Sequence, residues 1–155
     1  MKDEKPRIIV VDDDTNICST ISLFLRLNGY DVDVANSGKE AVRKSKTRIY
    51  DVALLDIRLP DIDGTKLLTA FRPTTPKTIK IVVTGFPTLD NAVQALKLGA
   101  DDYVVKPVDP EELVQIIQKK LDERKETHMM TEDKIRGFIE TRTAKLLEDE
   151  SAQTE

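Results

Sequence analysis

Residues 8–14 read IIVVDDD, an apolar run that ends in three acids, and the same pattern recurs along the chain. The later runs read VALLD at 52–56, IVVT at 81–84 and YVVKP at 103–107. Short runs rich in Val and Ile that alternate with longer amphipathic stretches predict βαβ units and a parallel sheet with helices on both faces. The carboxyl ends of parallel strands share one edge, so we expect the polar residues after these runs to meet there.

The number of alternating elements favours one sheet order. Five strands and five helices predict an α/β fold with a doubly wound, five-stranded parallel sheet in the order 2-1-3-4-5, which is the flavodoxin-like topology, with a C-terminal helical extension. Its switch point lies between strands one and three, which are followed by Asp12, Asp13 and Asp56. We therefore expect one folded domain over residues 6–124 and a helical, partly disordered C-terminal tail over residues 125–155.

Capping and breaking residues predict where several helices begin and end. The expected signals are Asp14 or Thr15 and Asn28-Gly29 for the first helix, Ser37 with Glu40 for the second, Gly99 after the fourth and Asp109-Pro110 before the last. The first helix is expected to bury Ile17, Ile21, Phe24 and Leu25. Residues 72–77, which include two prolines, are expected to interrupt the pattern.

Composition and charge exclude several classes of function. Eight of the 28 acidic residues but four of the 24 basic residues lie in residues 126–155, so the first 125 residues are neutral overall. A nucleic-acid-binding protein normally carries a basic face, and four Phe, three Tyr and no Trp offer little aromatic surface for bases. We expect no direct nucleic-acid binding.

The N-terminus and the single cysteine bear on the cellular compartment. The charged first residues lead into only four apolar residues, too few for a signal peptide, and no run could cross a bilayer. Cys18 is alone, so it cannot form an internal disulfide, and we expect a small buried thiol. A soluble cytoplasmic protein without membrane contact is expected.

Three carboxylates in one crevice predict a cation and a phosphoryl ligand. The mutual repulsion of Asp12, Asp13 and Asp56 is costly unless a cation compensates it, and oxygen ligands suit Mg²⁺. Magnesium is usually held by one or two carboxylates together with phosphate oxygens. Lys106 would place a positive charge and Thr84 a hydroxyl beside such a group, and an aspartate can itself become an aspartyl phosphate.

These residues closely resemble a known family, the receiver domain of two-component response regulators. The resemblance covers residues 6–124, and its motifs occur in order, each at the end of the expected strand. In this sequence the motifs read VVDDD at 10–14, LLDIRLPDIDG at 54–64, VTG at 83–85 and GADDYVVKP at 99–107.

The resemblance implies a role for each residue of the crevice. Asp56 would be the phosphoacceptor, which takes a phosphoryl group from a phosphohistidine of a sensor histidine kinase or phosphotransfer protein. Asp13, Asp56 and the backbone carbonyl of Arg58 would ligate Mg²⁺, and Asp12 would act mainly through a coordinated water.

The same resemblance assigns the residues that respond to phosphorylation. Lys106 would pair with the phosphoryl oxygens, and the Lys106-Pro107 bond would be cis. Thr84 would shift to hydrogen-bond the phosphoryl group, and Tyr103 would move inward into the space that it leaves. The chain would be a signalling switch and not an enzyme, catalysing only its own phosphorylation and dephosphorylation.

The expected output is a change in partner binding. Phosphorylation would shift the face of the fourth helix, fifth strand and fifth helix, where an unidentified downstream protein or a second copy of the chain would bind. The residues expected near that face are Phe86, Ala92, Ala95, Lys97 and Gln115.

Other interpretations of the same residues remain open from the sequence. Asp13, Asp14 or Thr15 could cap the first helix, Asp56 could be a turn residue, and Thr84, Tyr103 and Lys106 could have ordinary structural roles. The acids at 12–14 also resemble a haloacid-dehalogenase-like phosphatase with Asp12 as nucleophile, although that leaves Asp56 and Lys106-Pro107 unexplained. A phosphorylation-independent adaptor with the same fold is the third possibility.

The tail has two interpretations. Residues 131–147 can form an amphipathic helix, with Gly137 weakening it by about 1 kcal/mol relative to Ala. The helix could fray and become disordered from Glu148, or its apolar side could dock on a partner or a second copy under the control of phosphorylation. That side consists of Ile135, Phe138, Ile139, Leu146 and Leu147. His128 is expected to be a surface residue, because no second ligand has suitable spacing.

Overall fold

The computed structural model of the protein describes residues 4–71 and 77–153, so the break expected at 72–77 falls almost wholly outside the described residues. The strands are β1 (Arg7–Val11), β2 (Asp31–Ala35), β3 (Val52–Leu55), β4 (Ile79–Thr84) and β5 (Asp102–Val105). The helices are α1 (Thr15–Leu27), α2 (Gly38–Thr47), α3 (Gly64–Ala70), α4 (Leu89–Lys97) and α5 (Pro110–Gln153).

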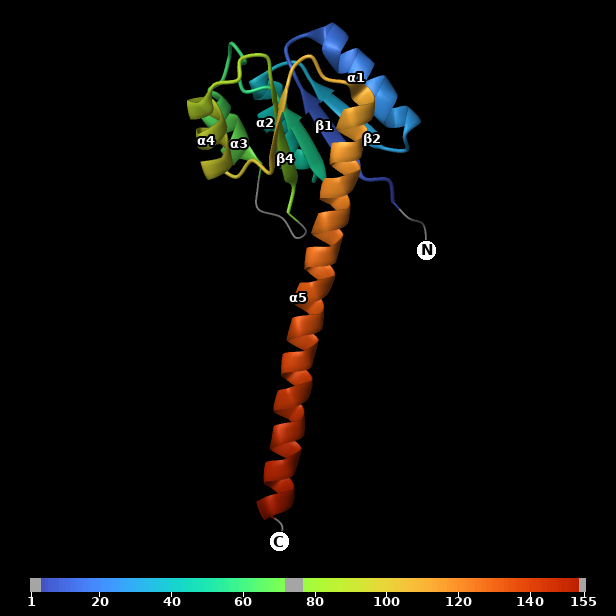
Figure 1. Ribbon diagram of the computed structural model, residues 1–155, viewed down its shortest axis with the longest axis vertical. Coiled ribbons are helices and arrows are strands. Elements are labelled where there is room, and N and C mark those ends of the chain that lie inside the picture. The colour runs from blue at the N-terminus through green and yellow to red at the C-terminus, as the bar shows by residue number, and fades with distance from the viewer. Residues whose placement is uncertain (1–3, 72–76, 154–155) are drawn as a thin grey trace. The chain divides into compact units, whose positions relative to one another are not determined.

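All five strands are parallel and lie in the order β2-β1-β3-β4-β5, which confirms the predicted doubly wound α/β sheet. Helices α2, α3 and α4 cover one face of the sheet, and α1 and the first turns of α5 cover the other (Figure 1). Parallel strands need such crossovers, because a tight turn cannot return the chain to the same end of the sheet.

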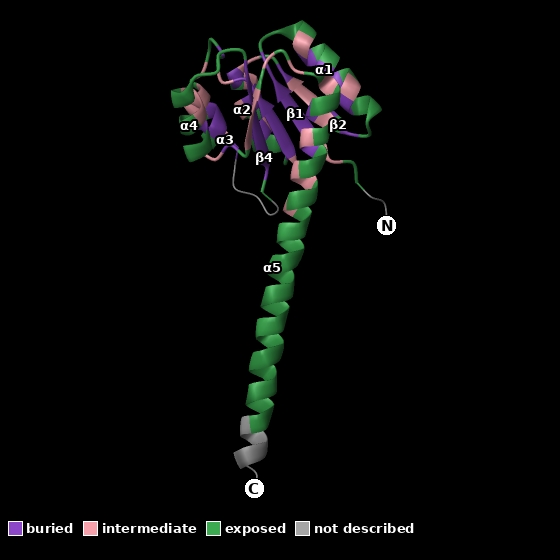
Figure 2. Ribbon diagram, viewed as in Figure 1, coloured by how far each residue is buried: buried purple, intermediate pink, exposed green. Residues whose placement is uncertain are grey.

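The core consists of strand residues that alternate between the two faces. Ile9 and Val11 pack with residues of α2, α3 and α4 in one cluster, whereas Ile8 and Val10 are buried on the other face. Side chains along a strand point to opposite faces, so a sheet covered on both sides buries every position of its central strands β3 and β4. Figure 2 shows this as an inner sheet that is almost wholly buried.

The caps of α1 and α2 follow the sequence signals. Asp14 is the N-cap of α1, and Gly29 follows its C-terminus with a φ of 91°, a conformation that glycine adopts without strain. Ser37 Oγ accepts the Glu40 N–H (3.1 Å), while the Glu40 carboxylate accepts the Asn36 N–H (3.1 Å).

The buried stripe of α1 differs from the prediction by one position. Ile21 and Leu25 are buried as expected, but Cys18 and Ser22 share that stripe, while Ile17 and Phe24 are only partly buried. The small side chains let α1 lie close to the sheet, and Ser22 satisfies its hydroxyl by donating to the Cys18 carbonyl.

The chain divides into two units, Met1–Lys120 and Leu121–Glu155. In the first unit α5 buries Leu113 and Ile117. In the second unit the chain is helical through Gln153, beyond Glu148, where the sequence suggested that a disordered end would begin. Residues with high helix propensity and no proline fill this stretch, and the helix continues through Gly137.

The second unit exposes its apolar side chains. Phe138 is 61 % exposed, and the Arg142 guanidinium lies 5.1 Å from the centre of its ring. His128 forms an exposed pair with Glu132, consistent with the expected surface role. Among the side chains described in this unit, further large apolar ones that are exposed are Met129, Met130, Ile135, Ile139, Leu146 and Leu147.

Candidate functional site

The register of the sheet brings the predicted polar residues to one edge. Val11 of β1 pairs with Leu55 of β3, so Asp12 and Asp56, the next residues, emerge side by side. Thr84, the last residue of β4, pairs with Val105, and Lys106 follows directly. The convergence at the carboxyl ends therefore results from strand register, as expected for a doubly wound sheet.

Lys106 joins the two buried acids across the switch point. Its Nζ lies 2.6 Å from Asp12 Oδ2 and 3.1 Å from Asp56 Oδ2. Asp12 is 4 % exposed and Asp56 is 6 % exposed, so this ammonium compensates two shielded negative charges. Such pairing is what permits carboxylates to remain ionised away from bulk water.

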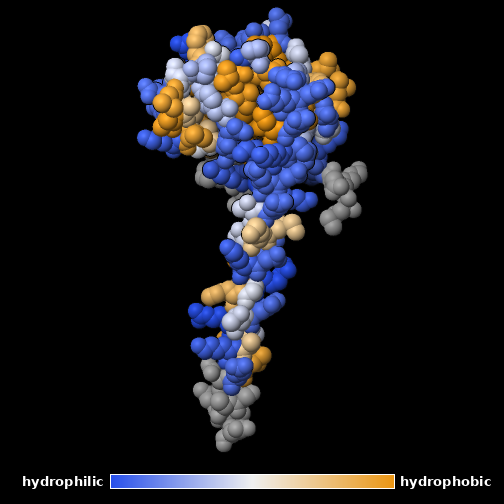
Figure 3. Space-filling model, in the orientation of Figure 1, coloured by the Kyte–Doolittle hydropathy of each residue, from blue (hydrophilic) through white to orange (hydrophobic). Residues whose placement is uncertain are grey.

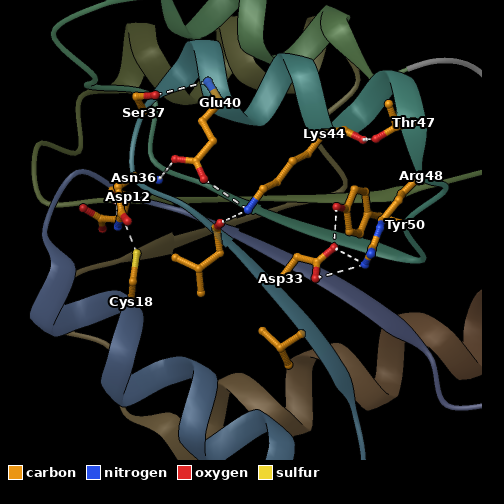
Figure 4. Close-up of polar contacts among 12 residues, drawn as sticks. Asp12, Cys18, Asp33, Asn36, Ser37, Glu40, Lys44, Thr47, Arg48 and Tyr50 are labelled. Atoms are coloured by element: carbon orange, nitrogen blue, oxygen red, sulfur yellow. Dashed lines mark hydrogen bonds and ion pairs between the residues drawn. The ribbon is translucent and has the colours of Figure 1, made fainter.

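The second oxygen of each acid is held by the backbone. Asp12 Oδ1 accepts the Asp14 N–H (2.9 Å), and Asp56 Oδ1 accepts the Arg58 N–H (2.9 Å). The main-chain carbonyl of Asp12 accepts hydrogen bonds from Cys18 Sγ and Asn36 Nδ2, both at 3.3 Å (Figure 4). The two N–H contacts hold the carboxylates of Asp12 and Asp56 in place, and the contacts to the Asp12 carbonyl hold its backbone, which together give the preorganisation that charge-stabilising sites require.

Thr84 and the loop after β4 form the next part of the site. Thr84 is fully buried, and its Oγ1 accepts the Phe86 N–H (3.1 Å). The Phe86 ring is half exposed and carries the Arg58 guanidinium 3.8 Å from its centre, within the range of a cation–π contact. The loops after β3 and β4 thus touch each other beside Asp56.

Tyr103 and Pro107 complete the predicted set. The Tyr103 hydroxyl is shielded from solvent and has no hydrogen-bond partner among the described residues. The residue as a whole is only partly buried, and its inward movement on phosphorylation stays a prediction. The Lys106-Pro107 bond is cis.

The electrostatics of the site follow from burial and pairing. Burial raises the pKa of Asp56 and the charge of Asp12 adds to this, although the Arg58 N–H and Lys106 act in the opposite direction. For Lys106, burial alone would lower the pKa, but the hydrogen bonds and charges of Asp12 and Asp56 together outweigh burial and raise it. Lys106 therefore stays protonated beside a carboxyl group that ionises less readily than usual.

The three acids suit a hard divalent cation. One carboxylate oxygen from each of Asp12, Asp13 and Asp56 lies within 4.8 Å of the others, and Asp13 is the exposed member. An all-oxygen donor set with one open side fits Mg²⁺, which retains several waters. Arg58 lies in the loop that follows Asp56. Its N–H donates to Asp56, and its carbonyl is the group predicted to bind the ion.

The capping interpretation applies to Asp14 alone. The Asp14 carboxylate accepts the backbone N–H groups of Asn16 and Ile17, so α1 needs no cap from Asp13 or Thr15. Sequence reasoning missed Asn36, which holds the Asp12 carbonyl from the end of β2. Nothing in its spacing identifies it, because the contact depends on β1 and β2 being neighbours.

Cys18 is the buried thiol that its helical position predicted. It is 1 % exposed, and burial, with the charge of Asp12 adding to it, raises its pKa to about 11. It therefore remains a protonated thiol that donates to Asp12.

Within the described residues, none of the helices combines the length and apolar character needed to cross a membrane.

Known proteins with the same pattern identify the family. Residues 8–118 match the model of the response regulator receiver domain. The transcriptional regulatory protein ZraR of Escherichia coli O157:H7 is 37 % identical over 114 residues, which are 74 % of this chain and 26 % of ZraR. The transcriptional regulatory protein PrrA of Mycobacterium bovis is 37 % identical over 122 residues, 79 % of this chain and 52 % of PrrA. The chain thus spans about a quarter to a half of the length of these relatives.

Solved structures agree with the sequence matches. A CheY-like response regulator receiver domain protein from Methanospirillum hungatei superposes with a TM-score of 0.76 at 40 % identity, covering 80 % of this chain and 99 % of that one. The match does not favour the phosphatase or the adaptor interpretation. The sequence resemblance is confirmed, and the chain belongs to the family of receiver domains of two-component response regulators, whose role is signalling.

Proposed function

We propose that Asp56 accepts a phosphoryl group from a phosphohistidine of a sensor histidine kinase or phosphotransfer protein. An oxygen of the ionised Asp56 carboxylate attacks phosphorus, the P–N bond breaks, and the imidazole leaves with the bonding electron pair and takes up a proton. The product is an aspartyl phosphate. Its hydrolysis, in which water attacks phosphorus and Asp56 is restored, returns the switch to its starting state.

The observation that carries this proposal is the position of Lys106 between Asp12 and Asp56. A fixed ammonium beside the acceptor can neutralise the charge of the arriving phosphoryl group, and phosphoryl transfer depends mainly on positioning and charge. The raised pKa of Lys106 keeps it charged for this purpose. Asp12 would remain as a carboxylate partner of Lys106 after Asp56 is phosphorylated.

Mg²⁺ would be held by Asp13, Asp56 and the Arg58 carbonyl, with Asp12 acting mainly through water. When bound, the ion supplies positive charge that compensates the acids and the phosphoryl oxygens. The clustering of three carboxylates supports this assignment. The exposed position of Asp13 leaves one side of the cluster open for exchange of the ion and for the phosphodonor.

The switch would begin at Thr84. Its hydroxyl now accepts the Phe86 N–H, so a turn of Thr84 toward the phosphoryl group breaks that bond and frees the loop after β4. Tyr103 lies on neighbouring β5 with a shielded hydroxyl, and it would repack as Thr84 moves. The phosphorylated state is thereby coupled to α4 and β5 through a shift in population.

The surface of α4 and β5 offers the apolar area that a partner would need. Leu89, Val93 and Leu96 project from one side of α4, and Val105 of β5 is 47 % exposed. Figure 3 shows apolar side chains gathered over α4. We propose that a downstream protein or a second copy binds here, with residues 6–124 as the receiver domain and residues 125–155 as a helical tail.

The phosphodonor would approach beside α1. A groove of about 530 Å³ lies next to Lys106 and is lined mainly by apolar side chains of α1 and the loop before α5. Lys106 lines this groove and contacts Asp56, so a donor protein bound there would bring its phosphohistidine toward the acceptor. The lining residues are Asn16, Ile17, Thr20, Ile21, Lys106, Pro107, Val108 and Pro110.

The test is to incubate the full chain and Asp56→Asn with Mg²⁺ and a small acyl-phosphate donor, and to map the label by mass spectrometry. We expect one phosphoryl group per chain, at Asp56 alone, with loss of labelling in Asp56→Asn and without Mg²⁺. Labelling at Asp12, or multiple turnover of a generic phosphate ester, would instead support a phosphatase.

A further inference from the structure

The loop between β3 and α3 is attached to the start of α2 by one exposed acid. Asp61 Oδ1 accepts the Gly38 N–H (3.0 Å), and Asp61 Oδ2 accepts the Lys39 N–H (2.9 Å). The two hydrogen bonds lower the pKa of Asp61, with the Lys39 N–H making the larger contribution. Both oxygens of one carboxylate thus join two elements that are more than twenty residues apart in sequence.

The approach between these elements is too close for any side chain at position 38. A Cβ atom on Gly38 would lie 1.7 Å from Ile62 Cγ2 and 2.8 Å from Ile62 Cβ, and 3.3 Å from Asp61 Oδ1. An alanine there must displace Ile62 and Asp61. Glycine at position 38 is therefore required by the contact with the loop, not by a turn of the backbone.

Helix α2 does not depend on Asp61 for its own cap. Ser37 Oγ accepts the Glu40 N–H, which is the hydrogen bond that an N-cap side chain provides. Asp61 comes from a different element and binds the two preceding N–H groups. Its contribution is thus a connection between the helix and the loop in addition to the cap.

The other end of the same loop contacts the acceptor. The Arg58 N–H donates to Asp56 Oδ1, and Arg58 forms a backbone bridge with Asp63. Gly64 follows so closely against Ile57 that a Cβ would lie 2.7 Å from the Ile57 carbonyl oxygen. Arg58 and Asp61 therefore lie in one short segment that is fixed at several points.

We propose that Asp61 is a positioning residue that couples the start of α2 to the Arg58 carbonyl and thereby to Mg²⁺ affinity. The inference rests on the metal site of the proposed function. Groups that orient a metal ligand without touching the ion commonly set its affinity, because a ligand free to turn must be ordered when the ion binds. Asp61 holds the loop so that this ordering is complete beforehand.

The coupling must act in both directions. If the tether raises Mg²⁺ affinity, Mg²⁺ binding must stabilise the tether to the same extent, since linkage between binding sites is reciprocal. The backbone amides of Gly38 and Lys39, at the start of α2, then report on the tether. Their hydrogen exchange should slow when Mg²⁺ binds, although neither residue contacts the proposed metal site.

The experiment is an Mg²⁺ titration of the full chain, followed by amide NMR and amide hydrogen exchange. Asp61→Ala removes the tether directly, and Gly38→Ala displaces it without changing any charge. We expect the Mg²⁺ dissociation constant to rise about tenfold in both variants. The Lys39 amide should also lose its response to Mg²⁺ in both.

Two control variants separate the tether from simpler effects. Ser37→Ala weakens the start of α2 but leaves the tether, and Asp63→Asn removes one charge from the same loop but leaves Asp61. Both should bind Mg²⁺ within about twofold of the wild type, because neither change removes a hydrogen bond of Asp61 and the charge of an exposed residue such as Asp63 is screened by salt. A lowered affinity in all four variants alike would show a general effect of stability or charge and would overturn the proposal.

The proposed function and this inference fail in different ways. If the wild type binds Mg²⁺ and folded Asp61→Ala binds it equally well, the positioning role is wrong and the metal site stands. If the wild type does not bind Mg²⁺, the metal site itself is wrong and the coupling is lost with it. Should Gly38→Ala not fold, Asp61→Ala alone decides, since its side chain is exposed.

Discussion

Lys106 and Lys80 are two shielded lysines near opposite ends of the same sheet, and they differ in what surrounds the ammonium. Lys106 follows β5 at the carboxyl edge and contacts Asp12 and Asp56. Lys80 is the second residue of β4, and its Nζ donates to the Leu68 carbonyl (2.7 Å) in the last turn of α3. One meets two negative charges, and the other meets the end of a helix.

Their pKa values move in opposite directions. Burial lowers the pKa of Lys80, with the charge of Lys77 adding to this, although Asp101 acts in the opposite direction. The carboxylates raise the pKa of Lys106 despite its burial. A buried charge therefore does not by itself indicate a functional site, because the end of a helix can also hold an ammonium. The meeting of one ammonium with two carboxylates at the switch point of the sheet is what indicates a functional site.

Replacing each lysine with methionine should give the largest difference between the two ends. Lys106→Met removes the cation that faces the phosphoryl group, and we expect Asp56 labelling to slow by about a hundredfold at saturating Mg²⁺. Lys80→Met makes the same replacement away from the site and should label at the wild-type rate. Initial rates measured by mass spectrometry decide, and equal rates for the two variants would refute the role of Lys106.

A smaller effect is expected from the charge of Asp56 on stability. The folded-state pKa of Asp56 is raised above the ordinary value of 3.8, mainly by burial, so the folded state holds this proton more tightly than the unfolded state. Stability is therefore lost as pH rises from the ordinary carboxyl range through the raised pKa. Without divalent cations, Asp56→Asn lacks this loss, and its stability should exceed that of the wild type near neutral pH.

Denaturant unfolding at several pH values in the presence of a chelator measures this difference. The advantage of Asp56→Asn should grow as pH rises through that window and then stay constant. Adding Mg²⁺ should reduce it, because the ion binds the ionised wild type and stabilises the folded state. If the difference in stability between Asp56→Asn and the wild type is the same at every pH, ionisation of Asp56 does not destabilise the folded state.

The carboxyl edge was predictable because strand ends can be read from local patterns. Asp12, Asp56 and Lys106 each follow a continuous apolar run, and parallel pairing brings such positions together whatever the loops do. Family resemblance then supplied their proposed roles. The distances from Lys106 Nζ to the two carboxylates could not be predicted, since they depend on strand register and on the side-chain conformation of Lys106.

Contacts between loops were beyond the sequence. Asp61 belongs to a motif that reads as a turn, and nothing in the sequence indicates that its carboxylate reaches Gly38 and Lys39. Lys80 likewise lies inside an apolar run, and its burial depends on where α3 ends. Both depend on how separate helices pack, which local propensity does not specify.

Lys80→Met should have the smallest effect on stability, within about 1 kcal/mol of the wild type at neutral pH, because two terms oppose each other. The replacement removes a buried ammonium, which favours folding, and leaves the Leu68 carbonyl without this donor, which disfavours it. The pH dependence is more diagnostic. Since the folded-state pKa of Lys80 is lowered, the unfolded state binds the proton more tightly, so the wild type gains stability relative to Lys80→Met as pH rises through the lowered pKa toward the ordinary value of 10.5. Denaturant unfolding at a series of alkaline pH values measures this gain, with Lys66→Met on the exposed side of α3 as the matched control. If the wild type gains the same stability relative to Lys66→Met as relative to Lys80→Met, Lys80 titrates as an exposed lysine does. The difference between Lys80 and Lys106 would then be one of exposure only.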